Sequence, residues 1–206
     1  MFTGIVQCTA QISQVTEQAY GRRLTLSLGT AHLSGVQHGA SIAINGVCLT
    51  VSAFDLSEGS VSFDVIAETL AKTNLGQWQV GDWVNVERSL SFGSEIGGHI
   101  VSGHVQTMAT LTELSNNETE WRLRLTLAPG FMRFILAKGF VAVEGCSLTV
   151  GETYADGFSL YLIPETLQLT TLGQKQVGDT LNIECDQQTM AIVQTVERLM
   201  AERYAN

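Results

Sequence analysis

A tandem repeat is the feature that most constrains how this chain can fold. Residues 45–51 (Asn-Gly-Val-Cys-Leu-Thr-Val) recur 99 positions later as residues 144–150 (Glu-Gly-Cys-Ser-Leu-Thr-Val). Farther along, residues 68–70 recur 97 positions later as residues 165–167, so one intervening loop differs by two residues. The chain has 206 residues, and two copies of about 100 residues match the usual size of a domain. Two long copies in the same order predict a duplicated domain rather than a solenoid.

Each copy contains a predicted β-hairpin with one polar and one apolar face. Asn45-Gly46 favours a two-residue type I′ turn, in which both turn residues adopt positive φ. Strand side chains alternate between faces, so a turn at this position predicts two sets of side chains. The polar face contains Ser41, Ala43, Cys48 and Thr50, and the apolar face, predicted to be core, contains Ile42, Ile44, Val47, Leu49 and Val51.

The second hairpin has a similar polar face with different chemistry. A two-residue turn at Glu144-Gly145 places Phe140, Ala142, Ser147 and Thr149 on the corresponding face. Ala and Thr are kept, whereas a thiol at position 48 is matched by a hydroxyl at position 147. We therefore expect two similar ligands held in unequal roles.

Composition excludes several classes of function. The formal net charge is −9, and the 11 Lys and Arg residues form no run, so a nucleic-acid partner is not expected. The four cysteines form no C-x-x-C pair, and no His or Cys spacing matches a metal template. We expect no signal peptide, no membrane span and no disulfide, and hence a cytoplasmic protein.

The remaining pattern predicts an all-β chain that ends in a helix. Short alternating stretches predict strands at 1–10, 24–28, 61–65 and 83–86 around a 39–51 hairpin, with a helical turn at 66–70 and a linker at 88–98. Short, Gly-rich, evenly spaced strands favour one small closed barrel per half. Asp186 is a candidate N-cap of an amphipathic helix that packs either on the barrels or on copies of itself. The expected domains are 1–96, 97–185 and 186–206.

Individual candidate residues have ordinary structural explanations. Cys48 alone resembles a small buried hydrophobe, and Lys138 a solvated charge. Ser147 and Thr149 alone are ordinary strand hydroxyls. His99 and His104 are candidates for proton transfer, yet each could equally be bonded to backbone, and a strand would point them to opposite faces. The duplication is what makes these positions candidates.

Four segments, taken in order, resemble riboflavin synthases of the alpha-chain type, a family of lumazine-binding repeats. These segments are 1–6 (Met-Phe-Thr-Gly-Ile-Val), 45–51, 97–104 (Gly-Gly-His-Ile-Val-Ser-Gly-His) and 163–167 (Ile-Pro-Glu-Thr-Leu). The resemblance covers nearly the whole chain. It implies two six-stranded Greek-key barrels related by internal duplication, plus a C-terminal helix through which three subunits associate.

The resemblance also implies an activity. Two molecules of 6,7-dimethyl-8-ribityllumazine would dismutate to riboflavin and 5-amino-6-(D-ribitylamino)uracil by transfer of a four-carbon unit, the last step of riboflavin biosynthesis. No cofactor or metal is implied. Each barrel would bind one substrate, with the active site between the first barrel of one subunit and the second barrel of a neighbour.

Carried over position by position, the resemblance implies a set of site residues. The reactive set is Ser41, Cys48, His104 and Thr149, assisted by Glu144, Lys138 and Ser147, with Phe2 closing the site. Glu144 stands where the family pattern has Asp, so its carboxylate lies one methylene farther out. The remaining substrate contacts are Gly4, Ile5, Val6, Leu49, Thr50, Asp64, Val65, Ile66, Ala67, Glu68, Thr69, Gly103, Val105, Leu148, Tyr161, Leu162, Ile163, Pro164, Glu165 and Thr166.

Two other classes of function compete with the enzyme. Lumazine-binding antenna proteins of luminous bacteria are similar in both halves but hold a lumazine or flavin as a fluorophore. We expect such proteins to lose the features that serve chemistry, whereas Phe2, Cys48 and both histidines are present here. A purely structural role leaves the polar faces of both hairpins unexplained.

Overall fold

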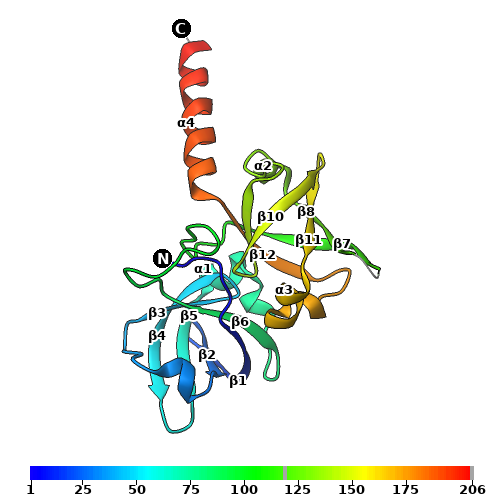
Figure 1. The fold of residues 1–206 in the computed structure, drawn as a ribbon. Helices are drawn as coiled ribbons and strands as arrows, with labels where there is room; N and C mark the ends of the chain where they lie inside the picture. Colours follow the sequence, from blue (N-terminus) through cyan, green and yellow to red (C-terminus); the bar gives the residue numbers. More distant parts are fainter. Residues whose placement is uncertain (118–119, 205–206) are drawn as a thin grey trace.

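The computed structural model describes residues 1–117 and 120–204, which form two closed six-stranded antiparallel barrels and a C-terminal helix (Figure 1). The first barrel consists of β1 (Cys8–Gln18), β2 (Gly21–Ser27), β3 (Ser41–Ile44), β4 (Val47–Asp55), β5 (Ser60–Ile66) and β6 (Trp83–Arg88). Short helices join these strands: η1 (Thr30–Leu33), α1 (Ala67–Lys72) and η2 (Asn74–Gln77). The expected fold class is confirmed.

The second barrel repeats the first. It consists of β7 (Thr107–Asn117), β8 (Glu120–Leu127), β9 (Phe140–Val143), β10 (Cys146–Thr153), β11 (Gly157–Leu162) and β12 (Thr180–Cys185), with α2 (Pro129–Met132), α3 (Pro164–Leu169) and η3 (Thr171–Gln174). The strand order is the same in both barrels, and both long first strands change register at equivalent places, between Ile12 and Gln14 and between Leu111 and Glu113. Each barrel encloses its own apolar cluster, centred on Phe63 in the first and Phe158 in the second.

Both predicted hairpins have the expected register. Ala43 pairs with Cys48 in the first barrel, and Ala142 pairs with Ser147 in the second. The turn residues adopt positive φ, 44° and 81° at Asn45 and Gly46. The two turns abut, so that a Cβ on Gly46 would lie 2.8 Å from the backbone nitrogen of Gly145.

The predicted strand at residues 1–10 is wrong in its bounds, since β1 begins at Cys8. The preceding residues leave the first barrel and cross to the second. Gly4, with φ of 73°, turns the chain, and its carbonyl accepts a hydrogen bond of 2.7 Å from the amide of Ser147. Val6 then packs in the core of the second barrel.

An equivalent segment crosses in the opposite direction. The carbonyl of Gly103 accepts a hydrogen bond of 2.8 Å from the amide of Cys48, and Val105 packs against the core of the first barrel. Where the two segments pass, Phe2 and Val101 form an isolated antiparallel bridge. The barrels therefore exchange segments reciprocally about a pseudo-two-fold axis.

Two buried glutamates fix the crossing segments. Glu87 on β6 accepts hydrogen bonds from the amides of Thr3 (2.6 Å) and Gly4 (3.0 Å). At the equivalent place on β12, Glu184 accepts from the amides of Ser102 (2.7 Å) and Gly103 (2.9 Å). Burial raises the pKa of Glu87 despite these donors. Each barrel thus anchors the segment that it sends to the other.

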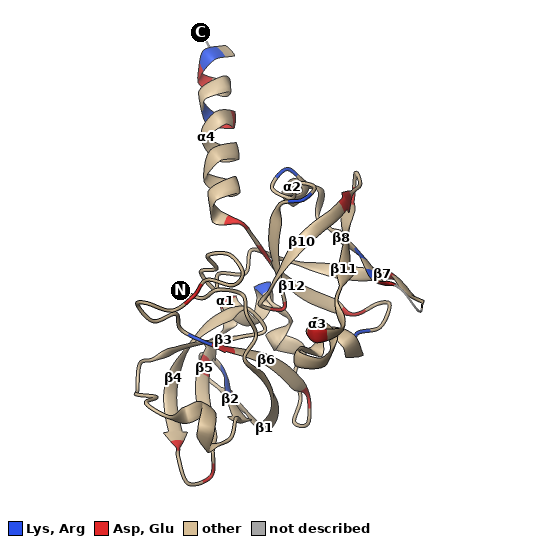
Figure 2. Ribbon diagram, viewed as in Figure 1, with Lys and Arg blue, Asp and Glu red and all other residues tan. Residues whose placement is uncertain are grey.

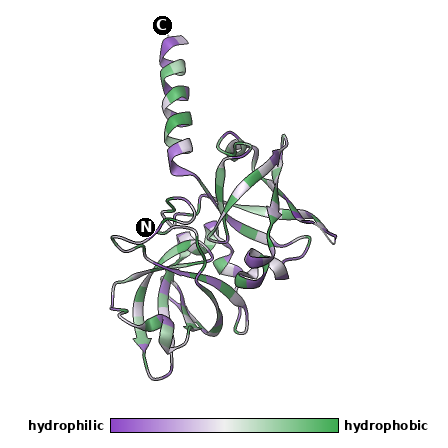
Figure 3. Ribbon diagram, viewed as in Figure 1, coloured by the Kyte–Doolittle hydropathy of each residue, from purple (hydrophilic) through white to green (hydrophobic). Residues whose placement is uncertain are grey.

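The C-terminal helix α4 (Gln187–Tyr204) projects away from the barrels (Figure 1), while Met190 and Val193 near its start pack against the core of the second barrel. The amide of Thr189 donates to the carboxylate of Asp186 at 2.8 Å, as expected of an N-cap. Apolar residues recur along the helix (Figure 3) and remain exposed: Ile192, Val196, Leu199 and Met200. Among the helices that the structure describes, none has the length and apolar character needed to cross a membrane.

We predict that Gly46→Ala destabilises the protein far more than Gly39→Ala. Both glycines have nearly equal φ, 81° and 82°, so both substitutions carry the same backbone strain of about 1–2 kcal/mol. Only the Cβ at position 46 meets backbone atoms of the facing turn, whereas no atom lies within 4 Å of one at position 39. Urea unfolding should show the two costs differing by about 2 kcal/mol or more; equal costs would contradict the close packing of the two turns.

Candidate functional site

A cavity of about 250 Å³ opens on the first hairpin, where the segment from the second half crosses. It combines three parts of the chain: β4, α1 with the residue that follows it, and the crossing segment. Its lining residues are Val47, Cys48, Glu68, Thr69, Lys72, Thr73, Gly103, His104 and Val105. Six of these were predicted as site residues, whereas Val47, Lys72 and Thr73 were missed.

The crossing segment packs so closely against Cys48 that position 103 has no room for a side chain. A Cβ on Gly103 would lie 2.6 Å from the Cβ of Cys48 and 2.9 Å from the ring of Phe2. Cys48 is half-buried beside an apolar cluster of Phe2, Ala43, Val101 and Ala142. His104 is exposed and lines the same cavity as Cys48. A thiol and an imidazole therefore share one small cavity, an arrangement suited to proton transfer and nucleophilic addition.

The equivalent position in the second barrel has a hydroxyl and a different histidine. Ser147 lies against Gly4, and its hydroxyl shares a hydrogen bond of 2.7 Å with Nδ1 of His99. The His99 ring stacks on Phe140 with centroids 5.2 Å apart. Burial lowers the pKa of His99, which favours the neutral ring. His99 was a candidate for proton transfer, within the Gly-Gly-His motif, but it was not among the site residues that the resemblance implies.

The other predicted residues of the first barrel do not line this cavity. Ser41 and Thr50 face each other across the hairpin on the polar side. Asp64 accepts two hydrogen bonds from Arg23, which lower the pKa of the carboxyl. Ile66 and Ala67 are exposed, whereas Leu49 and Val65 are buried in the barrel core and can offer only backbone.

The predicted residues of the second barrel differ in how deeply they are buried. Those that belong to its core are Val6 and Leu162, with Leu148 packed at its edge. Those that are exposed are Ile5, Lys138, Thr149, Tyr161, Ile163, Pro164 and Glu165, with Thr166 half-buried. The Tyr161 hydroxyl donates to Glu152, and this bond raises the pKa of the tyrosine.

Glu144 and Phe2 lie between the barrels. Glu144 is fully buried; its carboxylate accepts from the amide of Asn182 (2.6 Å) and from Asn74 (2.9 Å), and lies 3.4 Å from the Lys175 ammonium. Phe2 is also fully buried. Neither side chain lines the cavity at Cys48. The catalytic role expected of Glu144 stays a prediction, and Glu144 would have to act on a ligand there through neighbouring residues.

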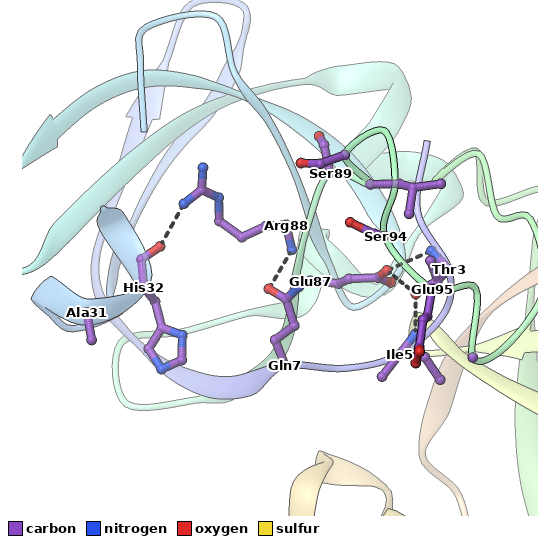
Figure 4. Close-up of a pocket in the computed structure, with 13 residues that line it drawn as sticks. Thr3, Ile5, Gln7, Ala31, His32, Glu87, Arg88, Ser89, Ser94 and Glu95 are labelled. Carbon is purple, nitrogen blue, oxygen red and sulfur yellow. Dashed lines mark hydrogen bonds between the residues drawn. The ribbon is translucent and has the colours of Figure 1, made fainter. Parts of the chain in front are cut away.

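A second cavity, of about 600 Å³, lies beside the linker between the barrels (Figure 4). Two of its charged groups already have partners: Arg88 donates to the carbonyls of His32 and Ser34, and Glu87 accepts from Thr3. We assign it no function. Within residues 1–117 and 120–204, no group of three His, Cys, Asp or Glu side chains is placed to hold a metal ion.

Comparison with known proteins first gives the class of protein. The family model described as "Lumazine binding domain" matches residues 3–89 and 102–186, one match for each barrel. A solved structure of LumP complexed with riboflavin superimposes with a TM-score of 0.82 at 25% identity, covering 90% of this chain and 100% of that one. A LumP structure with 6,7-dimethyl-8-(1'-D-ribityl) lumazine gives a TM-score of 0.80 at 24% identity.

Curated relatives then narrow the class. Riboflavin synthase of Escherichia coli is 47% identical over 204 residues, covering 98% of this chain and 95% of that protein. Riboflavin synthase of Chlamydia pneumoniae is 40% identical, covering 98% of each chain. The chain therefore belongs to the riboflavin synthase family, and each of its two barrels matches the lumazine-binding domain.

We predict that Glu144 makes stability depend on pH. Burial raises the pKa of Glu144 in the folded state, so its contribution to the free energy of unfolding is present below the unfolded pKa of about 4.3 and is lost as pH rises through the folded pKa. Glu144→Gln should therefore reduce the fall in stability between pH 4.5 and pH 8, measured by urea unfolding. Glu17→Gln, at an exposed pair with Arg22, is the control and should have little effect at either pH.

Lys175 provides an independent check on this buried pair. Lys175→Met leaves the Glu144 carboxylate without its counter-charge and should cost about 3–5 kcal/mol at pH 8. The double variant Glu144→Gln, Lys175→Met should cost less than the single Lys175→Met. If Glu144→Gln changed the free energy of unfolding equally at pH 4.5 and pH 8, the raised pKa assigned to Glu144 would be refuted.

Proposed function

We propose that the protein is a riboflavin synthase that converts two molecules of 6,7-dimethyl-8-ribityllumazine to riboflavin and 5-amino-6-(D-ribitylamino)uracil. One molecule gives up a four-carbon unit and becomes the uracil product, and the other accepts it and becomes riboflavin. The observation that carries the proposal is the pair of equivalent hairpins, one with a thiol and one with a hydroxyl, within a whole-chain match to riboflavin synthases. Two similar sites with unequal chemistry suit a reaction between two identical molecules.

Ligand binding of the lumazine type is supported by the structural neighbours. LumP has been solved with riboflavin and with the ribityl lumazine, and its fold matches both barrels of this chain. The antenna function left open from the sequence is not favoured, because riboflavin synthases are more similar in sequence, at 38–47% identity over nearly the full chain. The protein is thus proposed to act on this ligand rather than only to hold it.

The proposed catalytic work is positioning and proton transfer. Holding two planar rings against each other replaces a bimolecular encounter and can supply about 7–11 kcal/mol of the barrier. Cys48 and His104, which share a cavity, are proposed to assist addition and proton transfer at the first-barrel guest. Ser41, Thr149 and Ser147 are proposed to act from the polar faces of the two hairpins, with Lys138 beside the second and Glu144 in support.

We further propose a cytoplasmic homotrimer with the active site between subunits. The cavity at Cys48, about 250 Å³, is smaller than the roughly 300–1,000 Å³ of most ligand pockets. A surface from a neighbouring subunit would enlarge and close it. The uncovered apolar residues of α4 supply a contact through which copies of the chain can associate.

Incubation with the substrate tests the proposal directly. Purified protein and 6,7-dimethyl-8-ribityllumazine should yield riboflavin, detected by its absorbance, together with one equivalent of the uracil product. Lumazine bound tightly but unchanged after prolonged incubation would instead favour the antenna function.

We predict that Cys48→Ser slows turnover at least tenfold while changing the Kd for lumazine less than threefold. Cys48 lines the cavity, and the substitution replaces its thiol by a hydroxyl of lower nucleophilicity and similar size. Single-turnover kinetics and equilibrium fluorescence titration measure the two quantities. Cys8→Ser, at a half-buried cysteine outside this cavity, is the control. Parallel losses in rate and affinity would mean that Cys48 only shapes the site.

We also predict that Ile192→Glu with Leu199→Glu disrupts the trimer. Both side chains are more than half exposed in the single chain, so charges there should leave the barrels folded. Sedimentation should show smaller species with little activity. Gln194→Glu with Thr195→Glu, also on exposed positions of α4, serves as the control. An active trimer of unchanged mass in the first variant would show that α4 does not hold the assembly together.

A further inference from the structure

A third cavity, of about 510 Å³, lies where the two barrels meet and shares no lining residue with the cavity at Cys48. Its walls come largely from pairs of residues that the repeat relates, 97 positions apart. These pairs are Asn74 with Thr171, Gln77 with Gln174, Trp78 with Lys175, Asp82 with Asp179, and Trp83 with Thr180. The cavity therefore straddles the pseudo-two-fold axis, and a contact on one side can be compared with the equivalent position on the other.

On one side of the axis, the buried polar side chains bond directly to one another. The side-chain amide of Asn74 donates to the Glu144 carboxylate at 2.9 Å and to the carbonyl of Thr180 at 3.2 Å. The other oxygen of this carboxylate lies 3.4 Å from the Lys175 ammonium. Asn74 and Lys175 line the cavity, so the wall on this side consists of polar groups that already have partners.

On the other side, the equivalent contact is missing. Asn45 stands in place of Glu144, and Thr171 stands in place of Asn74; each is the shorter side chain of its pair. Asn85 holds both residues, because its backbone amide donates to the Asn45 side-chain oxygen at 2.6 Å and its side-chain oxygen accepts from the amide of Thr171 at 2.7 Å. Within residues 1–117 and 120–204, neither the Thr171 hydroxyl nor the Asn45 side-chain nitrogen has a hydrogen-bond partner. Asn45 and Thr171 are only 1% and 2% exposed, and both line the cavity.

These two unpaired groups require a partner that bonds to both. A buried polar group without a hydrogen bond destabilises the folded protein. The Asn45 side-chain nitrogen only donates and needs an acceptor, whereas the Thr171 hydroxyl both donates and accepts. A ligand hydroxyl meets both requirements, because it can accept from Asn45 while bonding to Thr171. The cavity has room for more than a water molecule, since about 510 Å³ lies within the roughly 300–1,000 Å³ of ligand pockets.

The remaining walls favour a molecule with several hydroxyls and an apolar side. Trp78 and Trp83 offer indole surface to C–H groups. Gln77 and Gln174 offer side-chain amides, which both donate and accept hydrogen bonds. A carbon chain that carries hydroxyls along its length matches both kinds of surface.

The charged groups at the cavity have opposite signs and partners of their own. Asp82 and Asp179 each accept a backbone amide hydrogen bond within their own turns, at 2.8 and 2.9 Å. Lys175 lies beside Glu144. The two carboxylates disfavour an anion and the ammonium disfavours a cation, so a neutral ligand fits best.

We infer that this cavity between the barrels is a binding site for a neutral polyol. One ligand hydroxyl bonds to the Asn45 side-chain nitrogen and to the Thr171 hydroxyl, and the carbon chain lies against the two tryptophans. The inference does not depend on the proposed function, because no residue of the cavity at Cys48 takes part.

Tryptophan fluorescence of the full-length protein, titrated with D-ribitol, tests this inference. The chain has three tryptophans, so Trp121→Phe leaves only the two that line the cavity. In this background, ribitol should change the emission saturably. Thr171→Val, which removes the hydroxyl at nearly constant size, should raise the Kd for ribitol about fivefold, as expected for the loss of one neutral hydrogen bond. Thermal stability is a poor readout here, because polyols stabilise folded proteins in general.

A second variant at the same position fills the gap instead of emptying it. Thr171→Asn supplies the side chain present at position 74, so it should bond to Asn45 and abolish saturable binding of ribitol. Thr112→Val, which removes a hydroxyl on β7 outside the cavity, is the control and should bind ribitol as the parent protein does. A change in emission that never saturates, or equal affinity in both Thr171 variants and the control, would overturn the inference.

Riboflavin carries a ribityl chain on a flat ring and distinguishes two sources of the polyol. Calorimetric titration that gives one more riboflavin per chain in the wild type than in Thr171→Asn would support the site and identify a ribityl chain as its occupant. Equal stoichiometry, together with saturable binding of ribitol, would support the site and identify a free polyol.

Discussion

The structure depends on a pair of carboxylates that each hold a segment of backbone passing to the other barrel. Glu87 and Glu184 accept paired amide hydrogen bonds from residues 3–4 and 102–103. These bonds aim Gly4 at Ser147 and Gly103 at Cys48. Neither hairpin site is therefore complete within its own half of the repeat, and the two sites are built by the same device used in opposite directions.

A layer of buried amides reinforces this exchange. Asn85 donates to the carbonyl of Glu144 at 2.9 Å, and Asn182 donates to the carbonyl of Asn45 at 3.0 Å. Buried amides with satisfied hydrogen bonds fix one relative placement of the barrels, because any other leaves polar groups unpaired. Charged residues are sparse along both barrels (Figure 2), which agrees with a chain of only 15% charged residues that hides surface between domains.

The sequence predicted the hairpin registers, the two barrels and the C-terminal helix, because these depend on the tandem repeat and on local turn residues. The Asn45-Gly46 turn set the register of the first hairpin, and the repeat transferred that register to Cys146 and Ser147. The two barrels and the helix after Asp186 followed from the duplicated pattern and its unrepeated end. The domain limits at 96 and 185 stay predictions, because residues 1–7 and 98–105 belong physically to both halves.

What the sequence did not reveal depends on contacts distant in the chain. The sequence of residues 1–10 cannot distinguish a strand in the first barrel from a segment that crosses to the second. Lys72 lines the cavity at Cys48 but was not predicted, because the sequence does not show that the end of α1 reaches this cavity. Glu144 was placed correctly in its turn, but its burial beside Lys175 arises only when the barrels meet.

Amide hydrogen exchange at Cys48 and Ser147 tests the reciprocal exchange most directly. The account predicts that Glu184→Gln, which loosens residues 102–103, accelerates exchange at Cys48 in the first barrel and leaves Ser147 unchanged. Glu87→Gln should do the opposite. Acceleration confined to the barrel that carries the substitution, or at neither amide, would contradict it.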